Sequence, residues 1–246
     1  MVALGPGVQG FSAGQRVYVA GAPTYADMVA APAESVWPLP DHVSAEQGAA
    51  IGVPYRTAYL ALHLVGEARP GDAVLVRGGS GGVGIAAIQL AAAHGCRVVA
   101  TAGTAAGQEL VREQGAQAVS GHDDLDRLRA LAGGQGYHLI VEMLANANLP
   151  SDLTLLADRG RVAVVGCRGA ATIDPRQLMT RSSSIRGVMG MTPEERRQIH
   201  AALDAGLRNR IITPVVGRRF ALAEAAAAHV AVMSPGAHGK IVLTMA

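Results

Sequence analysis

The chain has 246 residues and a formal net charge of +2; half of its residues are hydrophobic, 16% are charged and 3% are aromatic. This composition predicts a folded protein with a buried core and excludes a largely disordered chain. The near-neutral charge and the scarcity of aromatic residues also argue against nucleic acid or a membrane surface as a partner.

The first 43 residues are predicted to form β structure, because short apolar runs alternate there with glycine and proline. Strands are expected within residues 15–21, 25–31 and 34–40. The pattern then becomes helical. Ser44 and Gln47 have the spacing of a capping box, and Pro54 suits the first turn of a second helix.

From residue 73 onward, strands and helices are expected to alternate. Strands are predicted at residues 73–78, 97–101, 118–120, 138–143, 161–166 and 184–188. The intervening helices are predicted to begin near Gly82, Thr104, Asp123, Asn148 and Pro175. Such apolar strands are typical of a parallel sheet that is covered on both faces. The pattern therefore predicts an α/β fold with a doubly wound parallel sheet of the Rossmann type.

The C-terminal part is predicted to add two helices and a strand. Thr192 and Glu195 form a second capping box, and Pro193 suits the first helical position. We expect helices over 192–207 and 221–233 and a closing strand over 239–245. The basic run at 217–220 is interpreted as solvated surface.

Cysteine usage and the N-terminus favour a cytoplasmic protein. Cys96 and Cys167 are the two cysteines, and neither lies in a CxxC pair, so we expect no metal centre and no disulfide framework. The first ten residues lack the basic start and long apolar core of a signal peptide. The uncharged stretch from residue 78 to 96 contains glycines and polar residues, which argue against a membrane span.

A glycine-rich stretch, RGGSGGVG at residues 77–84, stands between the first parallel strand and its helix. Gly79, Gly81 and Gly84 match the GxGxxG fingerprint of dinucleotide-binding proteins. A pyrophosphate lies there against backbone N–H groups at a helix N-terminus, where a Cβ would hold it away. A purely structural turn is the alternative, but the flanking strand and helix and the repeated βα units favour nucleotide binding.

The end of the second parallel strand bears on the choice of cofactor. NAD-preferring sites usually carry an Asp or Glu there, which binds the ribose hydroxyls. Residues 98–104, VVATAGT, contain no acid and leave room for a 2′-phosphate, so we expect NADPH. Arg112 lies further on and is better explained as a solvated helix residue.

Six motifs along the chain carry a family resemblance: EQGAAIGVPYRTAY, VLVRGGSGGVG, TAGT, VEMLANANL, RVAVVGCRG and GAHGKIVL. They resemble the zeta-crystallin-type quinone oxidoreductases, in the zinc-free branch of the medium-chain dehydrogenase/reductase superfamily. The resemblance implies a co-chaperonin-like β-barrel over residues 1–44, a Rossmann domain over 45–190 and a return to the first domain over 191–246. It also implies NADPH-dependent reduction of quinones and a homodimer formed through the sixth strand.

The start of the chain departs from this family. Relatives have most of the barrel before a segment similar to VALGPGVQGFSAGQRV, which here occupies residues 2–17. The resemblance therefore implies an incomplete barrel and a substrate pocket that lacks part of its wall. We expect this chain to bind NADPH but to reduce quinones poorly, and to have exposed strand edges that lower its solubility.

The resemblance further implies cofactor contacts at the strand ends. The glycine loop would hold the pyrophosphate, Gly103 and His122 the adenosine end, Asn148 the ribose or nicotinamide, and the loops after the fifth and sixth strands the nicotinamide. The full set is Gly79, Ser80, Gly81, Gly82, Val83, Gly84, Gly103, His122, Asn148, Val165, Gly166, Cys167, Arg168, Val188, Met189 and Gly190. Structural roles are the alternatives for four of these residues: a helix cap for Asn148 and packing for Cys167, Val165 and Val188.

No catalytic side chain can be assigned, because hydride transfer is the chemistry of the cofactor. Tyr55 and Tyr59 are candidate pocket residues, with packing between domains as an equal alternative. Zinc-dependent relatives have clustered cysteines after the first strand, and residues 20–28 contain none. Residues 51–59 also lack the cysteine that is a catalytic zinc ligand in those relatives, so we expect no zinc. An enoyl or enal reductase and an NADPH-binding protein without turnover are the alternative functions.

Overall fold

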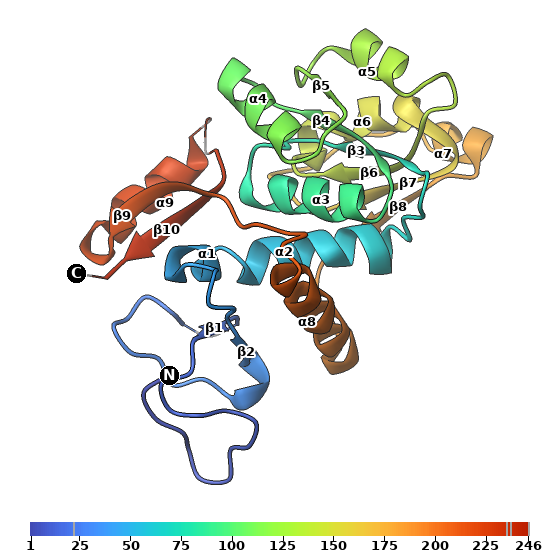
Figure 1. Cartoon of the computed structure of the whole chain (residues 1–246). Coiled ribbons are helices and arrows are strands. Elements are labelled where there is room, and N and C mark those ends of the chain that lie inside the picture. The colour runs from blue at the N-terminus through green and yellow to red at the C-terminus, as the bar shows by residue number, and fades with distance from the viewer. Residues whose placement is uncertain (22, 235, 237, 246) are drawn as a thin grey trace.

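The structure is a computed structural model that describes residues 1–21, 23–234, 236 and 238–245. At its centre is a parallel sheet of six strands in the order β5-β4-β3-β6-β7-β8 (Figure 1). The strands are β3 (Ala73–Val76), β4 (Arg97–Thr101), β5 (Ala118–Ser120), β6 (Tyr137–Glu142), β7 (Leu156–Val164) and β8 (Ser184–Gly187). The sheet grows outward from β3 in both directions, as in a doubly wound Rossmann fold, so the predicted fold class is confirmed.

Helices cover both faces of this sheet (Figure 1). One layer contains α2 (Gly52–Tyr59), its π-helical continuation η2 (Leu60–Val65), α3 (Gly82–Ala93) and α4 (Ala105–Glu113). The other contains α5 (Leu125–Leu131), α6 (Ala145–Leu155) and α7 (Arg176–Arg181). Side chains of β3 alternate between the layers, with Val74 and Val76 in the first and Ala73 and Leu75 in the second. All four are buried, which explains the continuous apolar run.

The helix starts follow the predicted caps. Ser44 forms its capping box at α1 (Ala45–Ala49), and Thr192 forms another at α8 (Pro193–Arg208). The Thr104 side chain accepts a hydrogen bond from Gly107 N and caps α4. α6 begins three residues before the expected start at Asn148. In the described part of the chain, none of the helices is both long and apolar enough to cross a bilayer.

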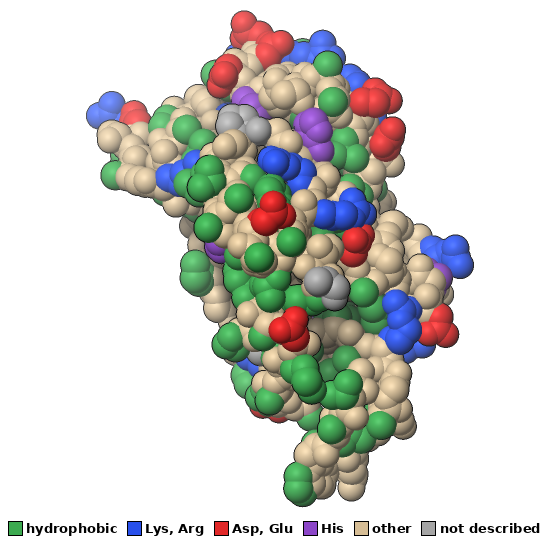
Figure 2. All heavy atoms as spheres, turned by 90° about the vertical axis from the view of Figure 1, so that its left-hand side faces the viewer, with side chains coloured by type: hydrophobic (Ala, Val, Ile, Leu, Met, Phe, Trp, Pro, Cys, Tyr) green, Lys and Arg blue, Asp and Glu red, His purple; other side chains and the backbone are tan. Residues whose placement is uncertain are grey.

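Two small sheets lie beside the central one. β1 (Val17–Val19) pairs antiparallel with β2 (Val36–Pro38), which follows the short η1 (Ala33–Ser35). β9 (Val216–Ala221) pairs parallel with β10 (Lys240–Thr244), and η3 (Leu222–Glu224) and α9 (Ala225–Met233) lie between them in the chain. Figure 2 faces this side of the molecule and shows hydrophobic side chains around a hollow in its lower part.

Two sequence predictions in this region were wrong. Residues 25–31 were expected to form a strand but form an irregular segment with a bend at 26–28, and Met28 is 72% exposed, because no described strand pairs with them. β9 was not expected, because its mostly exposed side chains do not alternate between apolar and polar. Its basic run is solvated as predicted, but it lies on a strand that is defined by its pairing with β10.

Candidate functional site

The glycine turn joins β3 to α3 by a tight path. Gly78 has a φ of +78°, and Gly79 N donates to the Thr101 carbonyl at 2.7 Å. A Cβ on Gly84 would lie 2.3 Å from the Gly78 oxygen, so this glycine allows the helix to pack against the turn. A Cβ on Gly81 would have room within the protein, since its nearest neighbour lies 3.9 Å away. The N–H groups of the first turn of α3 lack intrahelical partners and are available to an anion.

The loops after β4 and β5 meet through a histidine. The His122 ring lies on Gly103, where an added Cβ would be 3.2 Å from Nε2. The Thr101 hydroxyl accepts from Gly78 N at 3.0 Å and contacts His122 Nδ1 at 2.9 Å. This hydrogen bond orients the His122 ring over Gly103. Burial and the nearby Arg77 lower the pKa of His122, which favours the neutral form.

The loop after β6 is tied to the start of α6 by a buried carboxylate. Asn148 lies within α6, not at its cap, and its Nδ2 donates to Glu142 Oε1 at 3.0 Å. Asn146, which the sequence analysis did not single out, accepts from Arg168 N at 2.8 Å through its Oδ1. This bond joins the β6–α6 loop to the loop after β7.

The loops after β7 and β8 complete the same edge. A Cβ on Gly166 would lie 2.4 Å from the Met143 oxygen, so only glycine fits there. Cys167 is exposed, and its thiol donates to the Gly169 oxygen at 2.8 Å; its interpretation as a packing residue was wrong. Val188 is buried, whereas Met189 is 92% exposed. The structure thus brings the whole predicted set to the carboxyl edge of the sheet, where ligands of α/β proteins bind.

The C-terminal segment also reaches this edge. Gly239 N donates to the Ser80 oxygen at 2.8 Å, and Gly239 forms a β-bridge with Gly81. The alkyl stem of Lys240 lies beside Gly82, at 3.6 Å from the position of an added Cβ. Burial lowers the pKa of Lys240. Sequence reasoning missed this contact, although Lys240 is the only lysine of the chain.

A cleft of about 660 Å³ lies on the side of the small sheets, and two residues that line it, Pro54 and Lys240, lie next to Gly82. The cleft lies between β1, α1, α2 and β10. Tyr55 does not line it: the side chain is buried and donates to Gln89 Oε1 at 2.8 Å, so the packing alternative was correct. Tyr59 packs against His63, with 4.5 Å between ring centroids.

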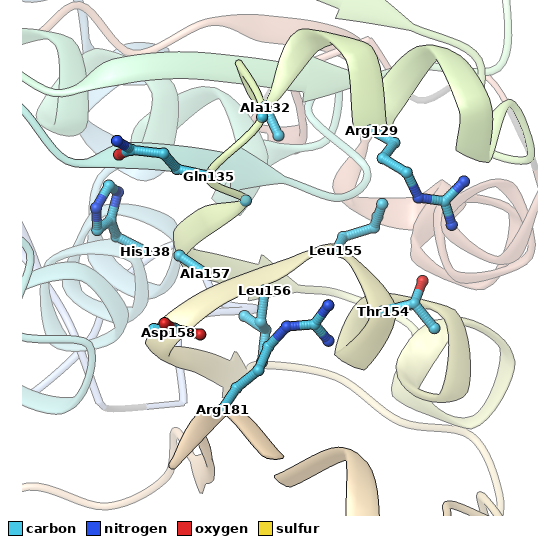
Figure 3. A pocket seen from close by; sticks show the side chains of 12 residues that line it. Arg129, Ala132, Gln135, His138, Thr154, Leu155, Leu156, Ala157, Asp158 and Arg181 are labelled. Carbon is cyan, nitrogen blue, oxygen red and sulfur yellow. The ribbon is translucent and has the colours of Figure 1, made fainter.

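A second cavity, of about 630 Å³, lies at the opposite edge of the sheet (Figure 3). Arg129, His138 and Arg181 line it, together with the first residues of β7, which include Asp158. It is separate from the loops that carry the predicted cofactor contacts. In the described residues, no three His, Cys, Asp or Glu side chains come together as a metal site would require.

The comparisons with known proteins agree with this architecture. Residues 82–205 match the family described as zinc-binding dehydrogenase. The chain is 42% identical to the quinone oxidoreductase of Rattus norvegicus, over 98% of this chain and 76% of the relative. It is also 42% identical to that of Homo sapiens, over 99% of this chain and 76% of the relative.

Solved structures show the same resemblance. A mycobacterial protein solved with NADPH superimposes with a TM-score of 0.89 at 32% identity, covering 98% of this chain and 79% of that one. The quinone oxidoreductase of Thermus thermophilus, also solved with NADPH, gives a TM-score of 0.79 at 36% identity, covering 89% of this chain and 73% of that one. The sheet order, the glycine loop and these identities lead to one conclusion: the chain belongs to the quinone oxidoreductase family.

Proposed function

We propose that this protein is an NADPH-dependent oxidoreductase that reduces quinones or related small electrophilic carbonyl compounds. The observation that carries the proposal is the glycine loop at the carboxyl edge, with a cleft directly beside it. Curated relatives at 42% identity are quinone oxidoreductases, and structural neighbours were solved with NADPH. No feature of the site favours an enoyl reductase or an NADPH-binding protein without turnover.

The glycine loop and Lys240 would hold the pyrophosphate. The first turn of α3 offers unpaired N–H groups and the positive end of the helix dipole. Lys240 would add a full positive charge beside Gly82, on the side of the cleft. Gly103, His122 and Asn148 would contact the adenosine and ribose parts, and the loops after β7 and β8 would flank the nicotinamide.

The preference for NADPH over NADH rests on the end of β4. Ala102, Gly103 and Thr104 follow this strand, and none of them is the carboxylate that would bind ribose hydroxyls and repel a 2′-phosphate. The structure adds His238, whose Nε2 lies 3.1 Å from Thr104 Oγ1. The side chains of Thr104 and His238 together offer hydrogen-bonding groups to a 2′-phosphate at the end of β4. Arg112 is engaged with Glu109 on the exposed face of α4, as the sequence analysis expected.

The quinone would occupy the cleft beside Pro54 and Lys240. When bound, NADPH supplies a hydride from its nicotinamide ring. The chain's own contribution is to hold the nicotinamide between the loops after β7 and β8 and to orient the acceptor beside it, since orientation carries much of the rate enhancement. No side chain of the site is assigned a proton-transfer step.

Further parts of the proposal concern organisation. We take residues 45–190 as the cofactor-binding part and residues 1–44 and 191–246 as the parts that complete the substrate side. β8 is the outer strand of the described sheet, so its pairing with a second copy would extend the sheet into a homodimer. Among the described residues, no three His, Cys, Asp or Glu side chains come together, which supports a zinc-independent reaction. The cysteine usage supports a cytoplasmic location.

Steady-state oxidation of NADPH tests the proposal most simply. The rate is compared with a simple benzoquinone and with a 2-enoyl thioester as acceptor. We expect oxidation with the quinone and little with the thioester. The reverse preference would assign an enoyl reductase, and NADPH binding without oxidation by either acceptor would assign a binding protein.

A further inference from the structure

Three charged side chains are buried together beneath the proposed cofactor loops. Arg77 follows β3, Glu142 ends β6, and Asp152 lies on α6; their side chains are 2%, 0% and 0% exposed. Arg77 Nε lies 2.9 Å from Asp152 Oδ1 and 3.7 Å from Glu142 Oε2. Buried charges are unfavourable unless they are paired and hydrogen-bonded. The stability of this cluster therefore depends on its net charge and on the hydrogen bonds that its members form.

The Arg77 guanidinium connects several segments of the site. Its Nη1 donates to the His122 carbonyl at 2.6 Å, and its Nη2 donates to Ser151 Oγ at 3.1 Å. Its backbone N donates to the Val141 carbonyl at 3.0 Å, and the glycine loop begins at the next residue. One side chain thus links the glycine loop, the loop after β5 and α6.

The Glu142 carboxylate orients Asn148. Its Oε1 accepts from the Leu144 backbone N and from Asn148 Nδ2. Because this oxygen accepts from both donors, the NH₂ group of the Asn148 amide must face Glu142. The amide oxygen of Asn148 is then available as an acceptor for a ribose hydroxyl of the cofactor.

The remaining carboxyl oxygens of the cluster lack aligned donors. Asp152 Oδ1 and Oδ2 and Glu142 Oε2 are buried, and no described donor forms a well-aligned hydrogen bond with them. A proton on one carboxyl group would supply this bond between Asp152 and Glu142. It would also reduce the charge of the cluster from −1 to zero, since one guanidinium faces two carboxyl groups.

We propose that the Arg77–Glu142–Asp152 cluster positions His122 and Asn148 for the cofactor, and that it does so with one proton held between the two carboxyl groups. Loss of this proton would leave an uncompensated negative charge beneath a site that binds a phosphate-rich molecule. Cofactor affinity would then fall at alkaline pH. The inference rests on the proposed function, because it assumes that NADPH binds at this edge.

The surroundings of Asp152 support this assignment. Burial is the main cause that raises the pKa of Asp152, and the adjacent Glu142 raises it further, to about 8. Arg77 opposes the rise. His122 is the other titratable group nearby, and its pKa is lowered by burial.

The other helices packed against α6 bring arginines that are engaged elsewhere. Arg127 of α5 donates to the Val119 carbonyl, and Arg181 of α7 donates to the Leu153 carbonyl. The charge balance of the cluster is thus set by Arg77, Glu142 and Asp152 themselves.

Titration of NADPH binding between about pH 7 and 9.5 tests the inference. We expect the affinity of the unmodified chain for NADPH to fall about tenfold as pH rises through 8. Loss of the shared proton adds one negative charge to the cluster, and this charge repels the phosphates of the cofactor. Asp152→Asn should lose this alkaline step, because one guanidinium then faces one carboxylate at every pH in the range. Glu142→Gln should also lose the alkaline step. Asp158→Asn, at an exposed position of β7 at the other edge of the sheet, is the control and should retain the step.

A second readout needs no cofactor. The raised pKa makes the folded chain bind one more proton than the unfolded chain between about pH 4 and 8. The melting temperature of the unmodified chain should therefore fall relative to Asp152→Asn across this range, and the difference should level off above about pH 8. A difference that does not change with pH would overturn the shared proton.

The two readouts separate the inference from the proposed function. An alkaline loss of affinity that persists in both Asp152→Asn and Glu142→Gln would overturn the inference and point to a group such as Lys240. A pH-independent affinity of the unmodified chain would overturn it as well. Absence of NADPH binding at neutral pH would contradict the proposed function, while the stability profile still decides whether the proton is shared.

Discussion

The six-stranded sheet and the N-terminal region are stabilised by different means. Every side chain of β3 is buried between two helical layers, whereas Val2 and Met28 of the N-terminal region are 78% and 72% exposed. This region is held instead by specific polar and ring contacts. Arg16 donates to three backbone carbonyls within residues 40–43, and His200 of α8 bonds the Tyr18 hydroxyl at 3.0 Å.

This contrast bears on function, because the two regions border the proposed site from opposite sides. The cofactor loops extend from a sheet with two packed faces, which holds them in place without a ligand. The cleft for the acceptor is bounded by β1 and β10, which belong to two-stranded sheets. Cofactor binding should therefore be robust, and the geometry of the acceptor side should be more sensitive to conditions.

The largest effect is expected at the contact between the glycine turn and α3. In Gly84→Val, the Cβ would overlap the Gly78 oxygen at 2.3 Å, and neither backbone segment can move away. We expect a loss of about 4 kcal/mol or more in the free energy of unfolding, or failure to fold. Urea denaturation measures this loss. A normally stable variant would show that the turn is less tightly packed than described.

A matched pair of truncations compares the two regions directly. Leu75→Ala leaves a cavity at the centre of the sheet and should lower the free energy of unfolding by about 3 kcal/mol. Met28→Ala removes an exposed side chain and should change it by less than about 0.5 kcal/mol. Similar losses in chemical denaturation would mean that the N-terminal segment is packed as firmly as the sheet.

Acid should weaken the attachment of the N-terminal region. His200 is buried against Trp37, with ring centroids 3.4 Å apart, and its Nε2 has no partner among the described residues. Burial is the main cause that lowers the pKa of His200 to about 4, and Arg56 and Arg196 lower it further. The unfolded chain therefore binds a proton first as pH falls below about 6.5, and about 2 kcal/mol of stability is lost towards pH 4.5.

Trp37 is the only tryptophan of the chain, so its fluorescence reports on this attachment. We expect its emission to change as pH falls towards about 4, where His200 takes up a proton in the folded chain. The variant His200→Gln can still accept from Tyr18 but cannot titrate, so it should lose most of this transition. An identical acid transition in the variant would assign the effect to other groups.

A smaller effect is expected at Lys240, where the two regions meet. Lys240→Gln removes the positive charge beside the N-terminus of α3 and should weaken NADPH binding about tenfold, or about 1.4 kcal/mol. Lys240→Arg keeps the charge and should retain most of the affinity. Calorimetric titration of the two variants measures the difference, and equal affinities would exclude a charge contact.

How much the sequence could predict differs between the same two regions. Within the sheet, apolar strands covered on both faces and local caps such as Thr104 and Thr192 carry strong local signals. The predicted order of strands and helices was therefore confirmed, apart from small shifts such as the earlier start of α6. Residues 25–31 and β9 were misjudged, because an exposed strand depends on its pairing partner more than on its own pattern.

In the candidate site too, features with a local sequence signal could be predicted, and contacts between distant segments could not. Residues directly after the predicted strands could be placed at the carboxyl edge from the fold alone. Lys240, His238 and Asn146 could not, because their proximity to the edge depends on contacts between distant segments. The charged cluster was also missed: Arg77 stands within the glycine motif, but its pairing with Asp152 joins residues 75 positions apart.

The central claim is that the glycine loop holds the cofactor, and Gly81→Val tests it most directly. Gly81 has a φ of −81°, which valine adopts without strain, and its Cβ would lie 3.9 Å from the nearest atom, so the variant should fold. Gly5→Val, whose Cβ would also lie 3.9 Å from its nearest neighbour, is the matched control away from the site. NADPH titrations of the variant, the control and the unmodified chain should show a loss of at least about 100-fold for Gly81→Val alone. A folded Gly81→Val variant that binds NADPH as tightly as the unmodified chain would contradict the account.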